Sequence, residues 1–190
     1  HPVAPSCEGV RVEIIVRLAH AVDADAICDA HVAAWRRGYE HVFPATILQG
    51  PTFDSDRRTR WRAWTHSQTS DQRLIVGVAD GAVVGFAHTG NGADESARPA
   101  DGTSTVGELY GFYLHPNAWG SGVATAMMNA AIDQLAELGH ARAVLWTLRE
   151  AHRARAFYEK SGWRPSGRTD TLTMYPDHPV AEVEYTRSFL

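Results

Sequence analysis

The stretch that most constrains the fold of this chain covers residues 109–124, LYGFYLHPNAWGSGVA. An apolar run typical of a β-strand ends at His115, a short turn carries the sequence WGSG at 119–122, and a helical pattern begins at Val123. A strand, a glycine turn and a helix in this order direct backbone N–H groups and the positive end of a helix dipole at one point. The sequence therefore predicts a site for a phosphate or pyrophosphate group.

The composition places the chain among ordinary globular proteins. Of its 190 residues 44% are hydrophobic and 21% are charged, a length and balance that favour one domain with a sizeable core. The formal net charge of -4 argues against non-specific nucleic-acid binding. Cys7 and Cys28 lie in no CxxC or Cys/His cluster, so we expect neither a metal site nor a disulfide framework. No apolar run reaches the roughly 18 residues of a membrane span, and we expect a cytoplasmic protein.

The periodicity of the apolar residues divides the chain into strands and helices. Residues 1–9 carry no signal-peptide pattern and are expected to be a disordered leader, and 10–190 are expected to form a single domain. A hairpin signal, Asp80-Gly81, separates two short apolar runs. The predicted elements are strands at 10–18, 73–78, 82–88, 105–114, 143–148, 163–174 and 180–189, and helices beginning near 23, 54, 123 and 151.

The order of these elements predicts an α/β fold. The strand, helix, strand unit over 105–148 has to be a right-handed crossover between parallel strands. The hairpin before it is expected to be antiparallel. The sequence therefore predicts a mixed sheet with helices on both faces.

Three motifs between Glu108 and Trp163 resemble those of the GCN5-related N-acetyltransferase (GNAT) family, and the resemblance extends roughly from Val10 to the C-terminus. The first motif is the turn, WGSGVA at 119–124, which is similar to the family's pyrophosphate loop Gln/Arg-x-x-Gly-x-Gly/Ala. Gly122 and Ala124 take its two small positions. Trp119 stands where the family usually has Gln or Arg, which removes one side-chain donor and leaves the backbone amides.

The second motif is the strand at 108–114, ELYGFYL. The resemblance implies a mixed, mostly antiparallel sheet of about seven strands with about four flanking helices, in which this strand splays from its parallel neighbour at 143–148. The gap would receive the pantetheine arm of coenzyme A, paired with the backbone of Phe112 and Leu114. Gly111 within the strand fits a bulge or a close backbone approach.

The third motif, ARAFYEKSGW at 154–163, is similar to the family signature A-x-x-F-Y-x-x-x-G-F. Tyr158 takes the position whose hydroxyl often protonates the departing thiolate, and an ordinary phenol pKa of about 10 suits that task. Ala151 stands where the family often has Asn, and His152 or Arg153 are candidates to compensate. The coenzyme-binding residues that the resemblance implies are Phe112, Tyr113, Leu114, Trp119, Gly120, Ser121, Gly122, Val123, Ala124, Thr125, Ala151, Arg155 and Tyr158.

The resemblance implies transfer of an acetyl group from acetyl-CoA to a primary amine, by direct attack in a ternary complex and with no metal. Glu108, at the head of the coenzyme strand, is the first candidate for a base acting through water, and an edge carboxylate without a role is the alternative. His88 is the second candidate, because a neutral imidazole is suited to accept the proton.

The acceptor site is expected to lie away from the coenzyme's nucleotide. Trp35, Tyr39, His88 and Trp146 are the predicted substrate-binding residues, and Trp35 is equally suited to core packing. The acceptor would be a small molecule or a peptide amine, and the chain would act as a monomer or homodimer. Two other functions remain open: a non-catalytic acyl-CoA sensor on the same fold, and binding of another phosphate-bearing ligand, although GxxxxGK[ST] and GxGxxG are both absent.

Overall fold

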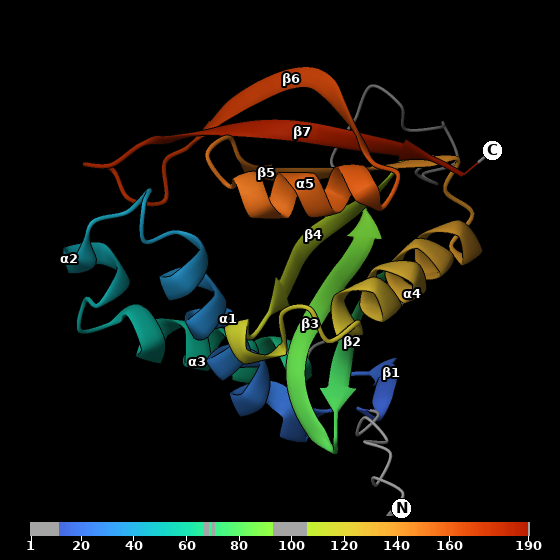
Figure 1. Ribbon diagram of the computed structural model, residues 1–190, viewed down its shortest axis with the longest axis horizontal. Coiled ribbons are helices and arrows are strands. Elements are labelled where there is room, and N and C mark those ends of the chain that lie inside the picture. Colours follow the sequence, from blue (N-terminus) through green and yellow to red (C-terminus); the bar gives the residue numbers. More distant parts are fainter. Residues whose placement is uncertain (1–11, 67–68, 70, 93–105, 190) are drawn as a thin grey trace, which may run out of the picture.

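The computed structural model describes residues 12–66, 69, 71–92 and 106–189. Within them seven strands form one sheet in the order β1-β2-β3-β4-β5-β7-β6 (Figure 1). The pair β4 and β5 is parallel, and the other neighbouring strands are antiparallel. The strands are β1 (Ile14–Leu18), β2 (Gln72–Ala79), β3 (Ala82–Asn91), β4 (Val106–Leu114), β5 (Arg142–Leu148), β6 (Arg164–Leu172) and β7 (Val180–Ser188).

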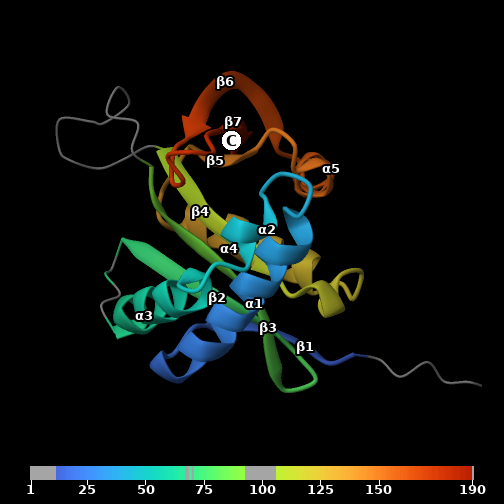
Figure 2. The ribbon, with the colours of Figure 1, turned by 90° about the vertical axis from the view of Figure 1, so that its left-hand side faces the viewer.

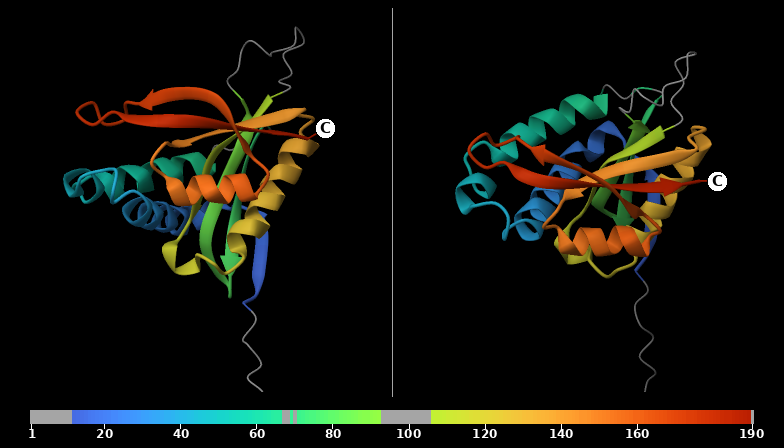
Figure 3. Two further views of the ribbon diagram at one scale, coloured as in Figure 1. Left: turned by 45° about the horizontal axis from the view of Figure 1, so that its top comes forward. Right: turned by 90° about the horizontal axis from the view of Figure 1, so that it is seen from above.

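Helices cover both faces of this sheet, as the sequence predicted. Helices α1 and α3 pack against each other on one face, and α4 packs on the other (Figures 2 and 3). The α-helices in the described residues are α1 (Ala24–Gly38), α2 (Ala45–Leu48), α3 (Phe53–His66), α4 (Val123–Glu137) and α5 (His152–Lys160).

The two faces of the sheet have separate cores because successive residues of a strand point to opposite sides. On the α4 face, Met127 and Leu135 pack with Ile75 of β2 and Leu145 of β5. The apolar spacing along 123–138 therefore marks the buried stripe of α4. On the other face, the buried residues of one cluster are Ala19, Ile27, Leu74, Val76, Val78 and Phe86.

A third cluster ties α1 to the second half of the sheet. Trp35 of α1 stacks on Phe43 with ring centroids 5.4 Å apart, and both belong to a cluster that includes Leu148 of β5 and Ala151. His178 Nε2 lies 2.8 Å from the carbonyl oxygen of Val42, which joins the β6–β7 connection to the segment after α1. These contacts fix the end of α1 beside the carboxyl end of β5.

The parallel pair separates along its length, which creates the space for a site. β4 pairs with β5 from Val106 to Leu109, and its later residues have no partner in β5. On its other edge β4 pairs with β3 as far as Leu114, with a bulge between Leu109 and Gly111. The predicted bulge near Gly111 is confirmed, and so is the mixed sheet with a splayed parallel pair.

Several local expectations need correction. The first strand begins at Ile14. A short helix, α2, occupies part of the segment 39–51, where no helix or strand was predicted. The helix predicted to begin near 54 is α3, which begins at Phe53; Asp54 lies in its first turn and pairs with Arg36 at 2.7 Å. The predicted leader 1–9 and the segment 93–105 lie outside the described residues, and the single domain over 10–190 stays a prediction. No helix within the described ranges is long and apolar enough to cross a membrane.

Candidate active site

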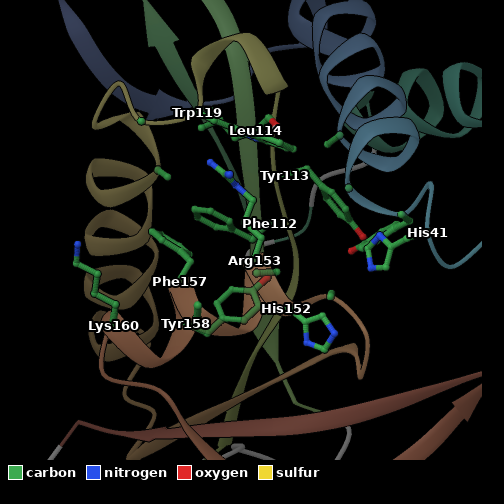
Figure 4. A pocket seen from close by; sticks show the side chains of 18 residues that line it. His41, Phe112, Tyr113, Leu114, Trp119, His152, Arg153, Phe157, Tyr158 and Lys160 are labelled. Atoms are coloured by element: carbon green, nitrogen blue, oxygen red, sulfur yellow. Dashed lines mark hydrogen bonds between the residues drawn. The ribbon is translucent and has the colours of Figure 1, made fainter.

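A cavity of about 460 Å³ lies where β4 departs from β5 (Figure 4). Its walls come from the end of β4, the turn before α4, helix α5 and the end of α1. The lining is mainly apolar and aromatic, with a few polar and basic side chains, which is typical of small-molecule sites. The lining residues are Ala34, Gly38, Tyr39, His41, Phe112, Tyr113, Leu114, Trp119, Gly120, Ala124, Ala151, His152, Arg153, Ala154, Ala156, Phe157, Tyr158 and Lys160.

The turn at one end of the cavity has the backbone shape of an anion site. Gly120 and Gly122 have φ values of 82° and 93°, a region that residues with a Cβ rarely adopt. Gly122 is the N-cap of α4 and has no side chain to cap the helix. The Val123 N–H donates to the Ser121 hydroxyl oxygen at 3.4 Å, and the other first-turn N–H groups of α4, which have no intrahelical acceptor, are available to an anion. No heavy atom beyond its chain neighbours lies within 4 Å of the Cβ position of Gly120, so the turn is open for a ligand to approach.

Tyr158 stands on α5 and faces the cavity with its phenol largely buried. Its side chain packs beside Phe112, with ring centroids 6.5 Å apart, and the residue is 6% exposed. Burial, with a smaller contribution from Tyr113, raises the pKa of the Tyr158 phenol well above its usual value. Within the described residues no group hydrogen-bonds the Tyr158 hydroxyl. This hydroxyl is thus a protonated donor available to a ligand.

Two more tyrosines lie near Tyr158 at the end of the cavity closest to α1. Burial raises the pKa of Tyr39 and that of Tyr113, so both phenols are neutral. Their neighbour Glu182 of β7 is half-buried, and burial followed by the charge of Asp170 raises the pKa of its carboxyl. This end of the cavity therefore presents neutral hydroxyl groups, with a carboxyl behind them.

Eight of the predicted coenzyme-binding residues line the cavity: Phe112, Tyr113, Leu114, Trp119, Gly120, Ala124, Ala151 and Tyr158. The predicted residues Ser121, Gly122, Val123, Thr125 and Arg155 are not among its lining. The Ser121 hydroxyl donates to the carbonyl of Ala118 at 2.7 Å and shapes the turn. Arg155 donates to the Tyr185 hydroxyl at 3.0 Å and to the carbonyl of Arg149 at 2.9 Å, which braces α5 against the sheet.

The two base candidates also lie outside the cavity lining. Glu108 sits in the paired part of β4, opposite Val144 of β5. Burial raises the pKa of the Tyr110 phenol to about 12, and the nearby charge of Glu108 contributes to this increase. His88 lies beside Trp64, with ring centroids 4.3 Å apart, and burial lowers its pKa to about 4. Its imidazole is therefore neutral at physiological pH.

Of the predicted acceptor residues, only Tyr39 lines the cavity. Trp35 is 5% exposed and packs edge-on against Tyr39, with ring centroids 5.0 Å apart, so it supports the wall from behind. Trp146 of β5 lies partly buried below the guanidinium of Arg168, which is 5.7 Å from its ring centroid. Trp35, His88 and Trp146 are thus spread over the α1 and α3 side of the sheet rather than gathered at the cavity.

Sequence reasoning missed several residues of the lining. His41 follows α1, and its Nε2 lies 2.8 Å from the carbonyl oxygen of Glu150, which joins the α1 side of the cavity to the start of α5. Lys160 adds a basic group at the end of α5, beside His152 and Arg153, the two residues that the sequence offered as candidates to compensate for Ala151. The position of Lys160 on the predicted helix was the available signal, whereas nothing near His41 in the sequence marks it. In the described part of the chain no group of three or more His, Cys, Asp or Glu side chains could hold a metal ion.

Comparisons with known proteins agree with this geometry. The family model described as "Acetyltransferase (GNAT) family" matches residues 30–163. Uncharacterized N-acetyltransferases of Mycobacterium bovis and Mycobacterium tuberculosis are 32% identical over 111 residues, which cover 58% of this chain and 64% of theirs. The match thus spans less than two thirds of the length of these relatives.

Solved structures show a similar fold at low sequence identity. The PaiA N-acetyltransferase of Thermoplasma acidophilum, solved in complex with coenzyme A, superposes with a TM-score of 0.71 at 15% identity, covering 93% of this chain and 99% of that one. A GCN5-related N-acetyltransferase of Rhodopseudomonas palustris superposes with a TM-score of 0.71 at 18% identity, covering 96% of this chain and 99% of that one. Because the family model covers more than half of the sequence, this chain belongs to the GNAT family of acetyltransferases.

Proposed function

We propose that this protein transfers an acetyl group from acetyl-CoA to a primary amine by direct attack in a ternary complex. The observation that carries the proposal is the edge of β4 beyond Leu109, which has no partner in β5 and borders a cavity that ends at the N-terminus of α4, where the N-cap is a glycine. This combination offers an extended backbone edge and an anion site within one pocket. Both match the chemistry of coenzyme A, whose arm carries amides and whose far end carries phosphates.

The chain's own residues fit the coenzyme in two places. The backbone of Phe112 and Leu114 would hydrogen-bond the pantetheine amides in the manner of an added strand. The N–H groups over 120–125 would bind the pyrophosphate at the positive end of the α4 dipole. Bound acetyl-CoA supplies a thioester, whose acyl group the acceptor amine takes up.

Tyr158 would act as the general acid for the departing thiolate. Its raised pKa keeps the phenol protonated at physiological pH, and its hydroxyl has no competing partner in the described residues. A thiolate, whose conjugate acid has an ordinary pKa of about 8.5, takes the proton only as it leaves. Tyr158 therefore holds a proton until the reaction needs one.

Glu108 would act as the base that removes a proton from the acceptor amine. It lies outside the cavity lining, so the proton would reach it through water. Its place on β4 supports this role, because it precedes Phe112 and Leu114 on the strand that borders the cavity. His88, a neutral imidazole on the adjacent strand β3, remains the second candidate.

The acceptor would approach from the α1 side of the cavity. Tyr39 lines that side, and Trp35 and Trp146 would form more distant walls of the approach. The acceptor would be a small-molecule or peptide amine, and the chain would act as a monomer or homodimer. The alternative is a non-catalytic acyl-CoA sensor, which the separation of Glu108 from the cavity lining favours.

Two measurements on the same protein separate these functions. Calorimetry with acetyl-CoA is expected to show saturable binding, and a thiol-release assay is expected to show turnover with a member of a panel of amines, polyamines, amino acids, aminoglycosides and peptides. Binding without thiol release across the panel would support the sensor. Absence of binding to both acetyl-CoA and CoA would contradict the enzyme and the sensor alike.

A further inference from the structure

Trp119 and Arg153 form a stacked pair that joins the two walls of the cavity. The Cζ atom of Arg153 lies 4.1 Å from the centroid of the Trp119 ring. Trp119 belongs to the turn between β4 and α4, and Arg153 to the first turn of α5 (Figure 4). Both line the cavity, so the contact places a cation from α5 beside the glycine turn.

The indole that carries this cation is itself held in place. Trp119 Nε1–H donates to the carbonyl of Leu114 at 3.0 Å, which ties the ring to the last residue of β4. A cation over an indole face is attracted by the partial negative charge of the ring face. The guanidinium therefore has a preferred position set by a ring that cannot easily turn.

Arg153 has no carboxylate partner among the described residues. A guanidinium stacked by its face on a ring keeps its N–H groups directed outward in its own plane. These N–H groups match the spacing of phosphate oxygens and can donate two parallel hydrogen bonds. The stacked pair is thus suited to bind an anion, because no carboxylate in the described part of the chain compensates its charge.

The glycine turn contributes backbone donors and lacks a charged side chain of its own. Position 119 in this turn holds the apolar indole of Trp119. We propose that Arg153, held on the Trp119 ring, binds the pyrophosphate of coenzyme A and supplies the side-chain donor that the turn lacks. The inference rests on the proposed function, and it assigns the pyrophosphate because Trp119 directly precedes Gly120.

Calorimetric titration with CoA tests this assignment. Arg153→Ala is expected to raise the Kd for CoA by about 10-fold or more, since hydrogen bonds to charged groups are the strong ones. The dependence of the Kd on salt concentration is expected to become shallower. Arg164→Ala is the matched control, because it removes the same charge from an exposed position on β6 outside the cavity. Thermal unfolding of each variant checks that it is folded.

Further variants separate the stacked pair from a general charge effect. Arg153→Lys keeps the charge and loses the planar guanidinium. Its Kd for CoA is expected to lie between those of wild type and Arg153→Ala. Trp119→Ala is expected to weaken binding although it removes no charge. Trp119→Arg, introduced into Arg153→Ala, is expected to restore the affinity by returning a cation to the turn.

The outcomes distinguish this inference from the proposed function. If wild type binds CoA and Arg153→Ala has the same Kd for CoA as Arg164→Ala, Arg153 has no role in binding. The inference then fails while the proposed function stands. If Arg153→Ala binds CoA more tightly, the pair obstructs the site, which also overturns it. The loss of affinity in Arg153→Ala is expected to persist when 3′-dephospho-CoA replaces CoA. If the loss disappears with 3′-dephospho-CoA, Arg153 contacts the 3′-phosphate, which overturns the assignment. If wild type binds neither CoA nor acetyl-CoA, the proposed function itself fails.

Discussion

Burial sets the protonation state of the tyrosines around the cavity and of the buried His31. Tyr39, Tyr113 and Tyr158 all have raised phenol pKa values because the ionised form would be desolvated. The same cause lowers the pKa of His31 to about 3, with further contributions from Arg57 and Arg60. The three tyrosines and His31 are therefore neutral over the whole physiological pH range. Because Tyr39, Tyr113 and Tyr158 line the cavity, it offers uncharged hydroxyl donors.

Replacing Tyr158 with Phe tests its role as the acid. We expect kcat to fall about 100-fold or more, because general acid catalysis contributes that much, while the Kd for acetyl-CoA changes less than about 2-fold. Steady-state thiol-release kinetics and calorimetry measure the two quantities. Tyr110→Phe is the matched control, since Tyr110 lies on β4 outside the cavity lining. Unchanged kcat in Tyr158→Phe would remove Tyr158 from the mechanism.

His31 makes the fold sensitive to acid. Trp61 Nε1–H donates to His31 Nδ1 at 3.0 Å, which requires the neutral ring. The folded pKa of about 3 lies below the unfolded value of about 6.5, so the unfolded chain binds the proton first as pH falls. The stability that the neutral His31 ring contributes is fully present above about pH 6.5 and is lost as the pH falls toward 3. At pH 5 the protonation of His31 in the unfolded chain lowers the free energy of unfolding by about 2 kcal/mol.

Chemical denaturation at pH 7.5 and pH 5 measures this loss. We expect the free energy of unfolding of wild type to be lower at pH 5, and the difference to shrink by about 2 kcal/mol in His31→Gln. His66→Gln is the control, because His66 is exposed at the end of α3. An equal pH dependence in wild type and His31→Gln would show that another group is responsible.

At the scale of elements, the unit β4, turn and α4 was predictable because its signals are local. An apolar strand, two glycines and a period of 3.6 residues lie within thirty or so consecutive positions. The widening of β4 from β5 after Leu109 was implied by family resemblance and not by any residue pattern. The contribution of α1 to the cavity through Ala34 and Gly38 was not predictable, because it depends on how distant segments pack.

Two glycines of similar backbone conformation separate the structural and ligand roles of the turn. Gly120 and Gly81 have φ values of 82° and 81°, and a Cβ at either position meets no atom within 4 Å. Ala at each position is expected to cost roughly 1 kcal/mol of stability through the left-handed conformation. Only Gly120→Ala is expected to weaken acetyl-CoA binding, because Gly81 lies in the β2–β3 hairpin. Denaturant unfolding and calorimetry compare the two, and equal affinities would argue against a phosphate at the turn.

At the scale of the whole molecule, one splayed pair of strands organises the pocket. The first four strands and α4 provide the glycine turn and the free backbone edge, whereas β5 and α5 provide Tyr158 and Arg153 (Figure 1). The sequence motifs predicted both halves separately. Their closure by His41 and by the stacking of Arg153 on Trp119 arises only when the halves meet, and so a local pattern could not indicate it.

A crystal structure of the protein with acetyl-CoA would show directly where the coenzyme binds. We expect the pantetheine arm along β4 between Phe112 and Leu114, the sulfur near the Tyr158 hydroxyl, and the pyrophosphate on the N–H groups over 120–125. A coenzyme bound elsewhere, or with its phosphates away from the glycine turn, would contradict this expectation.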